Sequence, residues 1–156
     1  MNVRRTGIDL DTSLGYALKE AASALRSAME DALRPLGLGV TQYACLELLD
    51  QRPGLSASDL ARGVFVTRQT MNVLLQALER DGMVARDADA ALGRSLPARL
   101  TTRGRAALQD ATTAVRAVEV RMLTGLTEAE QTHALQVLTG MASALRAPAP
   151  PDPDGA

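Results

Sequence analysis

Apolar side chains recur along much of this chain at alternating intervals of three and four residues, the spacing of one face of an α-helix. Two long stripes of this kind predict helices from about residue 12 to 36 and from about 102 to 123. Another helix is expected over 127–146, because Thr127 and Glu130 have capping-box spacing at its start. Such stripes can pair with a second helix. Their members are Leu14, Leu18, Ala21, Leu25, Ala28 and Ala32 in the first helix, and Leu108, Ala111, Val115, Val118 and Met122 in the second.

The middle of the chain has a different pattern, made of short segments separated by turn and capping residues. Thr41 is expected to cap a short helix over 42–50. Ser56 and Asp59 have the spacing of a capping arrangement and predict a second short helix, which ends at Gly63.

A third helix and a β-hairpin follow. Thr67 is expected to cap this helix, which continues to about Asp81, with Gly82 as the residue that ends it. Residues 83–86 and 96–101 are short enough to be the two strands of a hairpin. Two helices joined by a tight turn and followed by a hairpin are typical of a winged helix-turn-helix. The expected fold class is therefore mainly α with a small β-hairpin wing (α+β), in which N- and C-terminal dimerisation helices flank the winged helix.

The length of 156 residues is that of one domain. The terminal segments lack the pattern of a packed element, and the C-terminal one is rich in proline. The expected organisation is a flexible arm over 1–11, a domain over 12–146 and a disordered tail over 147–156. Within the domain, 12–36 and 102–146 are the expected dimerisation helices and 41–101 the winged-helix lobe.

Charge is distributed unevenly although the net charge is only −1. Between Arg62 and Arg105 there are eight arginines and four acids, so a basic segment lies within an acidic chain.

No apolar run approaches the roughly 20 residues of a membrane span, and no signal peptide is evident. A single cysteine excludes an internal disulfide, and the expected location is the cytoplasm.

The predicted helix after Thr67 has one apolar side and one side rich in amides. On a helical wheel, Met71, Leu74, Leu75 and Leu78 cluster on the inward side. Asn and Gln side chains can bond bidentately to adenine, arginine to guanine, and an apolar methyl can contact thymine. We therefore expect this helix to enter the major groove of double-stranded DNA. The candidate DNA-binding residues are Thr67, Arg68, Gln69, Thr70, Asn72, Val73, Gln76 and Arg80, with Arg94 in the wing as a minor-groove contact.

The order of elements resembles the MarR family of dimeric transcriptional regulators over about Thr12 to Arg146. The segments that carry the resemblance are Leu60-Ala61, 66–71 (VTRQTM), 78–84 (LERDGMV) and 100–105 (LTTRGR). One position departs from the family pattern. An Asp usually stands two residues before the arginine matched by Arg94, and here that residue is Leu92. The acid would help to hold the wing arginines, so its absence affects the geometry of Arg94.

The resemblance implies a homodimer whose two recognition helices address the half-sites of a pseudo-palindromic operator. Repression is the default expectation, because a protein bound over a promoter blocks the polymerase without any further contact. The stripes noted above point to the same dimer, and the candidate dimerisation residues are Leu14, Leu18, Leu108, Val115, Val118 and Met122. The resemblance also implies a small phenolic or aromatic effector bound between the dimerisation helices and the lobe. Tyr16 and Tyr43 are candidate ligand residues. The alternative for both is a packing residue, whose ring contacts other side chains and whose hydroxyl faces water.

Other chemistry is not indicated. Cys45 lies within a predicted helix with no cation nearby in sequence, so we expect a core residue rather than a redox sensor. His133 is the single histidine, so no metal-ligand spacing occurs and neither metal nor cofactor is expected. No nucleophile–base pair or phosphate loop suggests an enzyme. Two alternatives to a DNA-binding regulator stay open: the dimerisation part of an enzyme, and a winged helix used as a protein-interaction adaptor without specific DNA binding.

Overall fold

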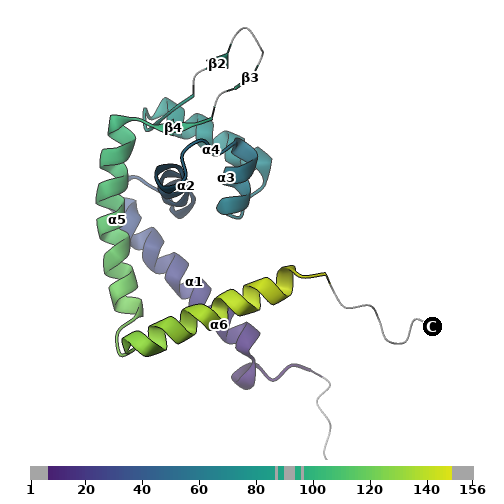
Figure 1. Cartoon of the computed structure of the whole chain (residues 1–156). Helices are drawn as coiled ribbons and strands as arrows, with labels where there is room; N and C mark the ends of the chain where they lie inside the picture. The colour runs from purple at the N-terminus through teal and green to yellow at the C-terminus, as the bar shows by residue number, and fades with distance from the viewer. Residues whose placement is uncertain (1–6, 87, 90–93, 96, 149–156) are drawn as a thin grey trace, which may run out of the picture. The chain divides into compact units, whose positions relative to one another are not determined.

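The computed structural model describes residues 7–86, 88–89, 94–95 and 97–148. The chain divides into two compact units, Met1–Glu119 and Val120–Ala156. In chain order the elements are η1 (Leu10–Thr12), α1 (Leu14–Leu33), η2 (Arg34–Leu36), α2 (Val40–Gln51), α3 (Ala57–Gly63), α4 (Arg68–Arg80), β1 (Val84–Ala85), β2 (Ala88–Asp89), β3 (Arg94–Ser95), β4 (Arg99–Leu100), α5 (Thr102–Met122) and α6 (Glu128–Arg146) (Figure 1). The fold class predicted from the sequence, mainly helical with a small hairpin, is confirmed.

Side-chain caps start the helices at most of the predicted places. The hydroxyls of Ser56, Thr67 and Thr127 each accept a hydrogen bond from the backbone N–H three residues on, at 3.1–3.3 Å. These bonds satisfy N–H groups that the first turn of a helix leaves without a partner. The helix starts predicted from these residues are therefore confirmed.

Two predicted starts differ from the structure. The first long helix begins at Leu14, because the Ser13 hydroxyl accepts from the Tyr16 N–H at 3.2 Å, and a separate short turn, η1, precedes it. Helix α2 begins at Val40 with Gly39 as its N-cap. The Gln42 side-chain oxygen accepts from the Gly39 N–H at 2.9 Å. The predicted cap, Thr41, therefore lies inside the helix. Most of the predicted arm and tail lies outside the described residues, and the predicted domain boundaries stay predictions.

The core of the first unit lies where α2, α3, α4, the base of the hairpin and the first part of α5 meet. Each large side chain buried there contributes roughly 1.5–3 kcal/mol through the hydrophobic effect. Helix α1 enters this core only near its C-terminal end. The buried cluster consists of Leu33, Leu38, Cys45, Leu46, Leu49, Leu60, Ala61, Met71, Leu75, Leu78, Val84, Ala98, Leu100, Leu108, Ala111 and Val115.

Cys45 is a fully buried member of this cluster. Its Sγ lies 3.9 Å from Met71 Sδ. Burial raises the pKa of the Cys45 thiol to about 12. Because reactivity requires the thiolate, this thiol is inert at neutral pH, and the prediction of a core cysteine is confirmed.

The hairpin consists of two short antiparallel ladders. In the first, Val84 of β1 pairs with Leu100 of β4, and both side chains are buried in the core. In the second, β2 pairs with β3, in register Ala88 with Ser95 and Asp89 with Arg94. The inner ladder thus anchors the hairpin to the lobe, and the outer ladder continues it.

The second unit contains the end of α5 and helix α6. No residue of α6 is buried in the single chain. Its apolar side chains include Leu135, Leu138 and Leu145, which are 67%, 47% and 85% exposed. These three exposed leucines follow one face of the helix, and we call them the open stripe of α6. Among the helices of the described residues, none combines the length and the apolar character that a bilayer crossing requires.

Candidate nucleic-acid interface

Helix α4 is held by one face and presents the other to solvent. Met71, Leu75 and Leu78 are 0–1% exposed and pack into the core. All the candidate DNA-binding residues of α4, together with Thr67 at its N-cap, are exposed, as the helical wheel predicted. Val73, an apolar residue among them, is 62% exposed. An apolar side chain left in water amid amides and arginines suits contact with the edges of base pairs.

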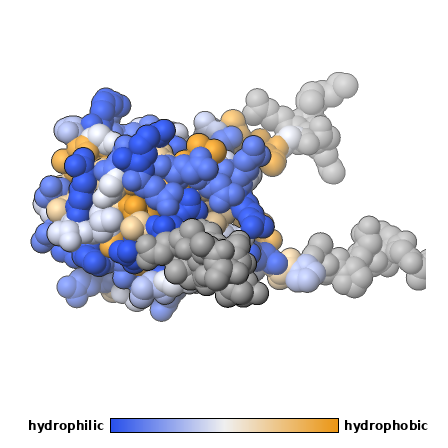
Figure 2. Space-filling view, turned by 90° about the horizontal axis from the view of Figure 1, so that it is seen from above, coloured by the Kyte–Doolittle hydropathy of each residue, from blue (hydrophilic) through white to orange (hydrophobic). Residues whose placement is uncertain are grey.

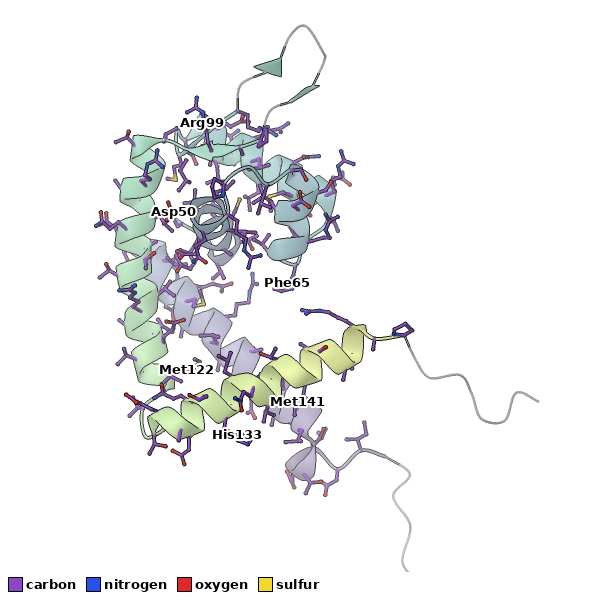
Figure 3. All side chains as sticks on the ribbon, viewed as in Figure 1. Asp50, Phe65, Arg99, Met122, His133 and Met141 are labelled. Atoms are coloured by element: carbon purple, nitrogen blue, oxygen red, sulfur yellow. The ribbon has the colours of Figure 1, made fainter. Side chains whose placement is uncertain are left out.

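A tight turn over residues 64–67 joins α3 to α4. The Val66 N–H donates to the Ala61 carbonyl at 3.0 Å, which fixes the direction of the chain before Thr67 caps α4. Phe65 in this turn has φ of 61°, a left-handed conformation that is rare outside glycine, and its side chain is 82% exposed. Phe65 lies on the side of the first unit remote from the hairpin (Figure 3). No sequence pattern predicted this conformation.

Residues 82–83 and 101–104 meet at the base of the hairpin. Gly82 ends α4 with φ of 72°, as predicted. The Thr101 hydroxyl donates to the Gly82 carbonyl at 2.6 Å and accepts from the Gly104 N–H at 3.0 Å. A Cβ on Gly104 would lie 1.9 Å from the Met83 carbonyl oxygen, so only glycine allows this approach. The two sequence segments that lead into and out of the hairpin therefore form one joint.

A second connection joins α4 to the hairpin. The Arg86 Nε and Nη2 atoms donate to the two carboxylate oxygens of Glu79 at 2.8 and 2.6 Å. These hydrogen bonds lower the pKa of Glu79 and raise that of Arg86. The pair stabilises the fold at neutral pH, and this contribution is lost as the pH falls through the lowered pKa of Glu79. Sequence reasoning counted Arg86 as a free positive charge and missed this pairing.

Arg94, the predicted wing contact, lies in β3. Its backbone is placed by the pairing with Asp89. Leu92 lies outside the described residues. The surface seen from the hairpin end is mainly hydrophilic, with a few separate hydrophobic residues (Figure 2).

The predicted dimerisation residues fall into two groups. Leu108, Val115 and Val118 are only 6–7% exposed, because the chain itself covers them. They can therefore add little area to a dimer interface, and their assignment to that surface stays a prediction. Leu14, Leu18 and Met122 are 71%, 42% and 52% exposed and remain available to a partner. Burial within the chain, and not the helical spacing, separates the two groups.

The two candidate ligand tyrosines have different surroundings. Tyr16 lies in the first turn of α1 and is 45% exposed. Tyr43 packs against the core, and its pKa is raised, first by burial and further by the charge of Glu47. Neither side chain is among the residues that line the cavity described next.

A cavity of about 550 Å³ lies between α2 and α5. Tyr43 interacts with two of its lining residues, Glu47 and Thr112. Its volume is within the range of small-molecule sites. At its wall the Thr112 hydroxyl donates to Glu47 Oε2 at 3.2 Å. No sequence pattern pointed to this cavity. Its lining residues are Glu47, Asp50, Arg105, Leu108, Gln109, Thr112, Thr113 and Arg116.

The part of the chain that the structure describes holds no cluster of three or more His, Cys, Asp or Glu able to bind an ion. His133 is exposed on α6 (Figure 3).

An exposed amide- and arginine-bearing helix, a tight turn before it and a hairpin anchored after it define a winged helix-turn-helix DNA-binding regulator. The model of the MarR family matches residues 36–95. The HTH-type transcriptional repressor Rv2887 of Mycobacterium tuberculosis is 44% identical over 137 residues, which cover 88% of this chain and 99% of the relative. The chain belongs to the MarR family.

Solved structures of Rv2887 agree with this assignment. A crystal structure of Rv2887 in complex with DNA has a TM-score of 0.68 and 41% identity, and the match covers 84% of this chain and 98% of that one. A complex of Rv2887 with salicylic acid has a TM-score of 0.68 and 45% identity, over 84% and 97% of the two chains.

Proposed function

We propose that this protein is a transcriptional repressor that binds a pseudo-palindromic DNA operator as a homodimer. The observation that carries the proposal is the exposed face of α4, held rigidly beside an anchored hairpin. The similar Rv2887 is named a repressor and has been crystallised with DNA, which supports the same action here. We propose neither a catalytic activity nor a cofactor, and we place the protein in the cytoplasm.

The side chains of α4 suggest how the operator is read. We propose that Gln69, Asn72 and Gln76 bond to base edges in the major groove and that Val73 contacts a thymine methyl. Thr67, Thr70, Arg68 and Arg80 would contact phosphates or guanines near the two ends of the helix. Arg94 would reach the adjacent minor groove from the wing. Base contacts supply specificity, and phosphate contacts supply affinity for any sequence.

Substitutions can distinguish the side chains that contact bases from those that contact phosphates. An operator is first selected from random duplexes, and binding is then measured by fluorescence anisotropy at two salt concentrations. Gln69→Ala and Gln76→Ala are expected to cost about 1–3 kcal/mol per half-site on the operator and little on random DNA. Arg94→Ala should weaken binding to both duplexes and lower the salt slope by about 1 per wing.

The control for the amide substitutions is Gln136→Ala, which removes an exposed glutamine from α6. It should leave both affinities unchanged. Equal losses on operator and random DNA for Gln69→Ala would remove the base-reading role of α4. Failure to select any preferred duplex would favour the protein-interaction adaptor.

The dimer would be built from the exposed apolar residues of the terminal helices. We propose that Leu14 and Leu18 of α1, Met122 of α5 and the open stripe of α6 pack against a second copy. Two-fold symmetry then places two α4 helices about one turn of DNA apart, roughly 34 Å.

We further propose that a small aromatic carboxylate releases the operator. Salicylic acid binds the similar Rv2887, and the cavity between α2 and α5 contains Arg105 and Arg116, which can pair with a carboxylate. Neither arginine forms an ion pair within the described residues. Neither candidate tyrosine is among the lining residues of this cavity, but Tyr43 interacts with two of them, Glu47 and Thr112.

Titration with salicylate tests this effector site. Saturating salicylate is expected to weaken operator binding about 100-fold, a coupling of roughly 2.7 kcal/mol. Arg116→Gln should reduce this response, while Arg121→Gln, which removes an arginine that does not line the cavity, should not. An unchanged response in Arg116→Gln would exclude a role for Arg116 in the effector site.

A further inference from the structure

The ion pair between Glu79 and Arg86 joins the C-terminal end of α4 to the start of the hairpin. Glu79 is the penultimate residue of α4, and Arg86 directly follows β1. The side chains of Arg86 and Glu79 are only 20% and 28% exposed. Salt screens a half-buried pair much less than it screens charges in open solvent. The two parallel hydrogen bonds also fix the angle of the guanidinium, because its donors form a rigid planar fork.

The backbone between the two residues forms a tight connection. The Met83 N–H donates to the Leu78 carbonyl at 2.9 Å, and Gly82 turns the chain in a left-handed conformation. On the other side of the hairpin, Thr101 ties the end of β4 to the Gly82 carbonyl. The Thr101 bond therefore holds the strand that leaves the hairpin, and the Glu79–Arg86 pair holds the strand that enters it.

The outer ladder, β2 with β3, begins two residues after Arg86 and includes Arg94. A small rotation of the chain at Arg86 would move the outer ladder relative to α4. Within the described residues, the Glu79–Arg86 pair therefore ties the strand that enters the hairpin to the recognition helix.

We propose that Glu79 and Arg86 are positioning residues that hold the wing at the angle at which α4 and the wing contact one operator together. The inference rests on the proposed function, since it requires the wing to contact DNA. Neither residue needs to touch a base. Their role is to make the major-groove and minor-groove contacts geometrically compatible.

Charge and geometry predict opposite results for one of the two single variants. If the residues act only through charge, Glu79→Gln strengthens DNA binding because it removes a negative charge, and Arg86→Gln weakens it. If they act as a pair, both variants weaken operator binding, by about tenfold, because each one releases the wing. The loss on random DNA should be smaller, since random DNA offers no fixed set of contacts to satisfy.

The experiment measures operator and random-DNA affinity for both single variants and for the exchanged pair Glu79→Arg/Arg86→Glu, which keeps the net charge. Asp81→Asn is the matched control, because it removes a negative charge from an exposed residue two positions after Glu79. Thermal unfolding identifies any variant that has lost the fold. Hydroxyl-radical footprinting reports wing contact separately, as protection at the outer edges of the operator.

We expect both single variants to lose operator affinity and outer protection, the exchanged pair to regain most of both, and Asp81→Asn to bind at least as tightly as the unmodified protein. Tighter operator binding by Glu79→Gln, similar to Asp81→Asn, would overturn the inference and leave the proposed function intact. Absence of operator binding by the unmodified protein would instead reject the proposed function, and this inference with it.

Discussion

Replacement of Gly104 by alanine is expected to lower the free energy of unfolding by about 3 kcal/mol or more. The new Cβ would lie 1.9 Å from the Met83 carbonyl oxygen and 2.9 Å from its carbon, and both are backbone atoms. Met83 cannot move aside, because its N–H donates to Leu78 at 2.9 Å and its carbonyl accepts from the Thr101 N–H at 3.1 Å. Relief of the clash would open the joint between α5 and the hairpin.

Calorimetry or circular dichroism on heating measures this effect. For a chain of this size, such a loss corresponds to a fall in Tm of roughly 10 °C. Gly140→Ala is the matched control, since an added Cβ there meets nothing within 4 Å. In a helix interior this change should raise stability by up to about 1 kcal/mol. If Gly104→Ala unfolds at the same temperature as the unmodified protein, the close approach to Met83 does not exist in solution.

The double substitution Leu14→Asp/Leu18→Asp is expected to convert the dimer into folded monomers. Both side chains are exposed in the single chain, so the substitutions should leave its core intact. In a dimer they would place four carboxylates in an apolar interface, which strongly disfavours association. Operator affinity should fall by at least about 100-fold, because two half-sites are no longer bound by one linked molecule.

Sedimentation velocity measures the oligomeric state, and circular dichroism verifies the fold. The control is Ser23→Asp/Ser27→Asp, which adds the same charges at the same spacing on the opposite face of α1. It should remain dimeric. A dimeric Leu14→Asp/Leu18→Asp variant would exclude this face of α1 from the interface. Val118→Asp is less informative, because Val118 is 7% exposed in the single chain and an aspartate there should unfold the protomer.

Local structure could be predicted from the sequence to within a few residues. The caps at Ser56, Thr67 and Thr127 and the turn at Gly82 depend on interactions between residues at most five apart, so short patterns are sufficient to identify them. The inward and outward faces of α4 were predicted for the same reason. Helical periodicity assigns side chains to faces once the inward residues are recognised.

Of the candidate functional sites, the sequence predicted the DNA-binding face, which lies on one continuous helix, and not the cavity. The residues of α4 follow from periodicity, but the cavity between α2 and α5 combines side chains distant in sequence. Glu47 and Thr112, which bond across it, are 65 residues apart. No sequence pattern predicts the left-handed conformation of Phe65 either, since a φ of 61° is unusual for phenylalanine.

The sequence by itself determined the order of the elements, their caps and turns, and the composition of the recognition face, because these depend on neighbours along the chain. Tertiary structure alone decided which apolar stripes are covered. Leu14 and Val115 belong to stripes of the same spacing, yet Leu14 is 71% exposed and Val115 only 6%. Burial depends on which elements the fold brings together, and so do the Gly104 contact with Met83 and the pairing of Glu79 with Arg86. Spacing along one helix does not contain that information.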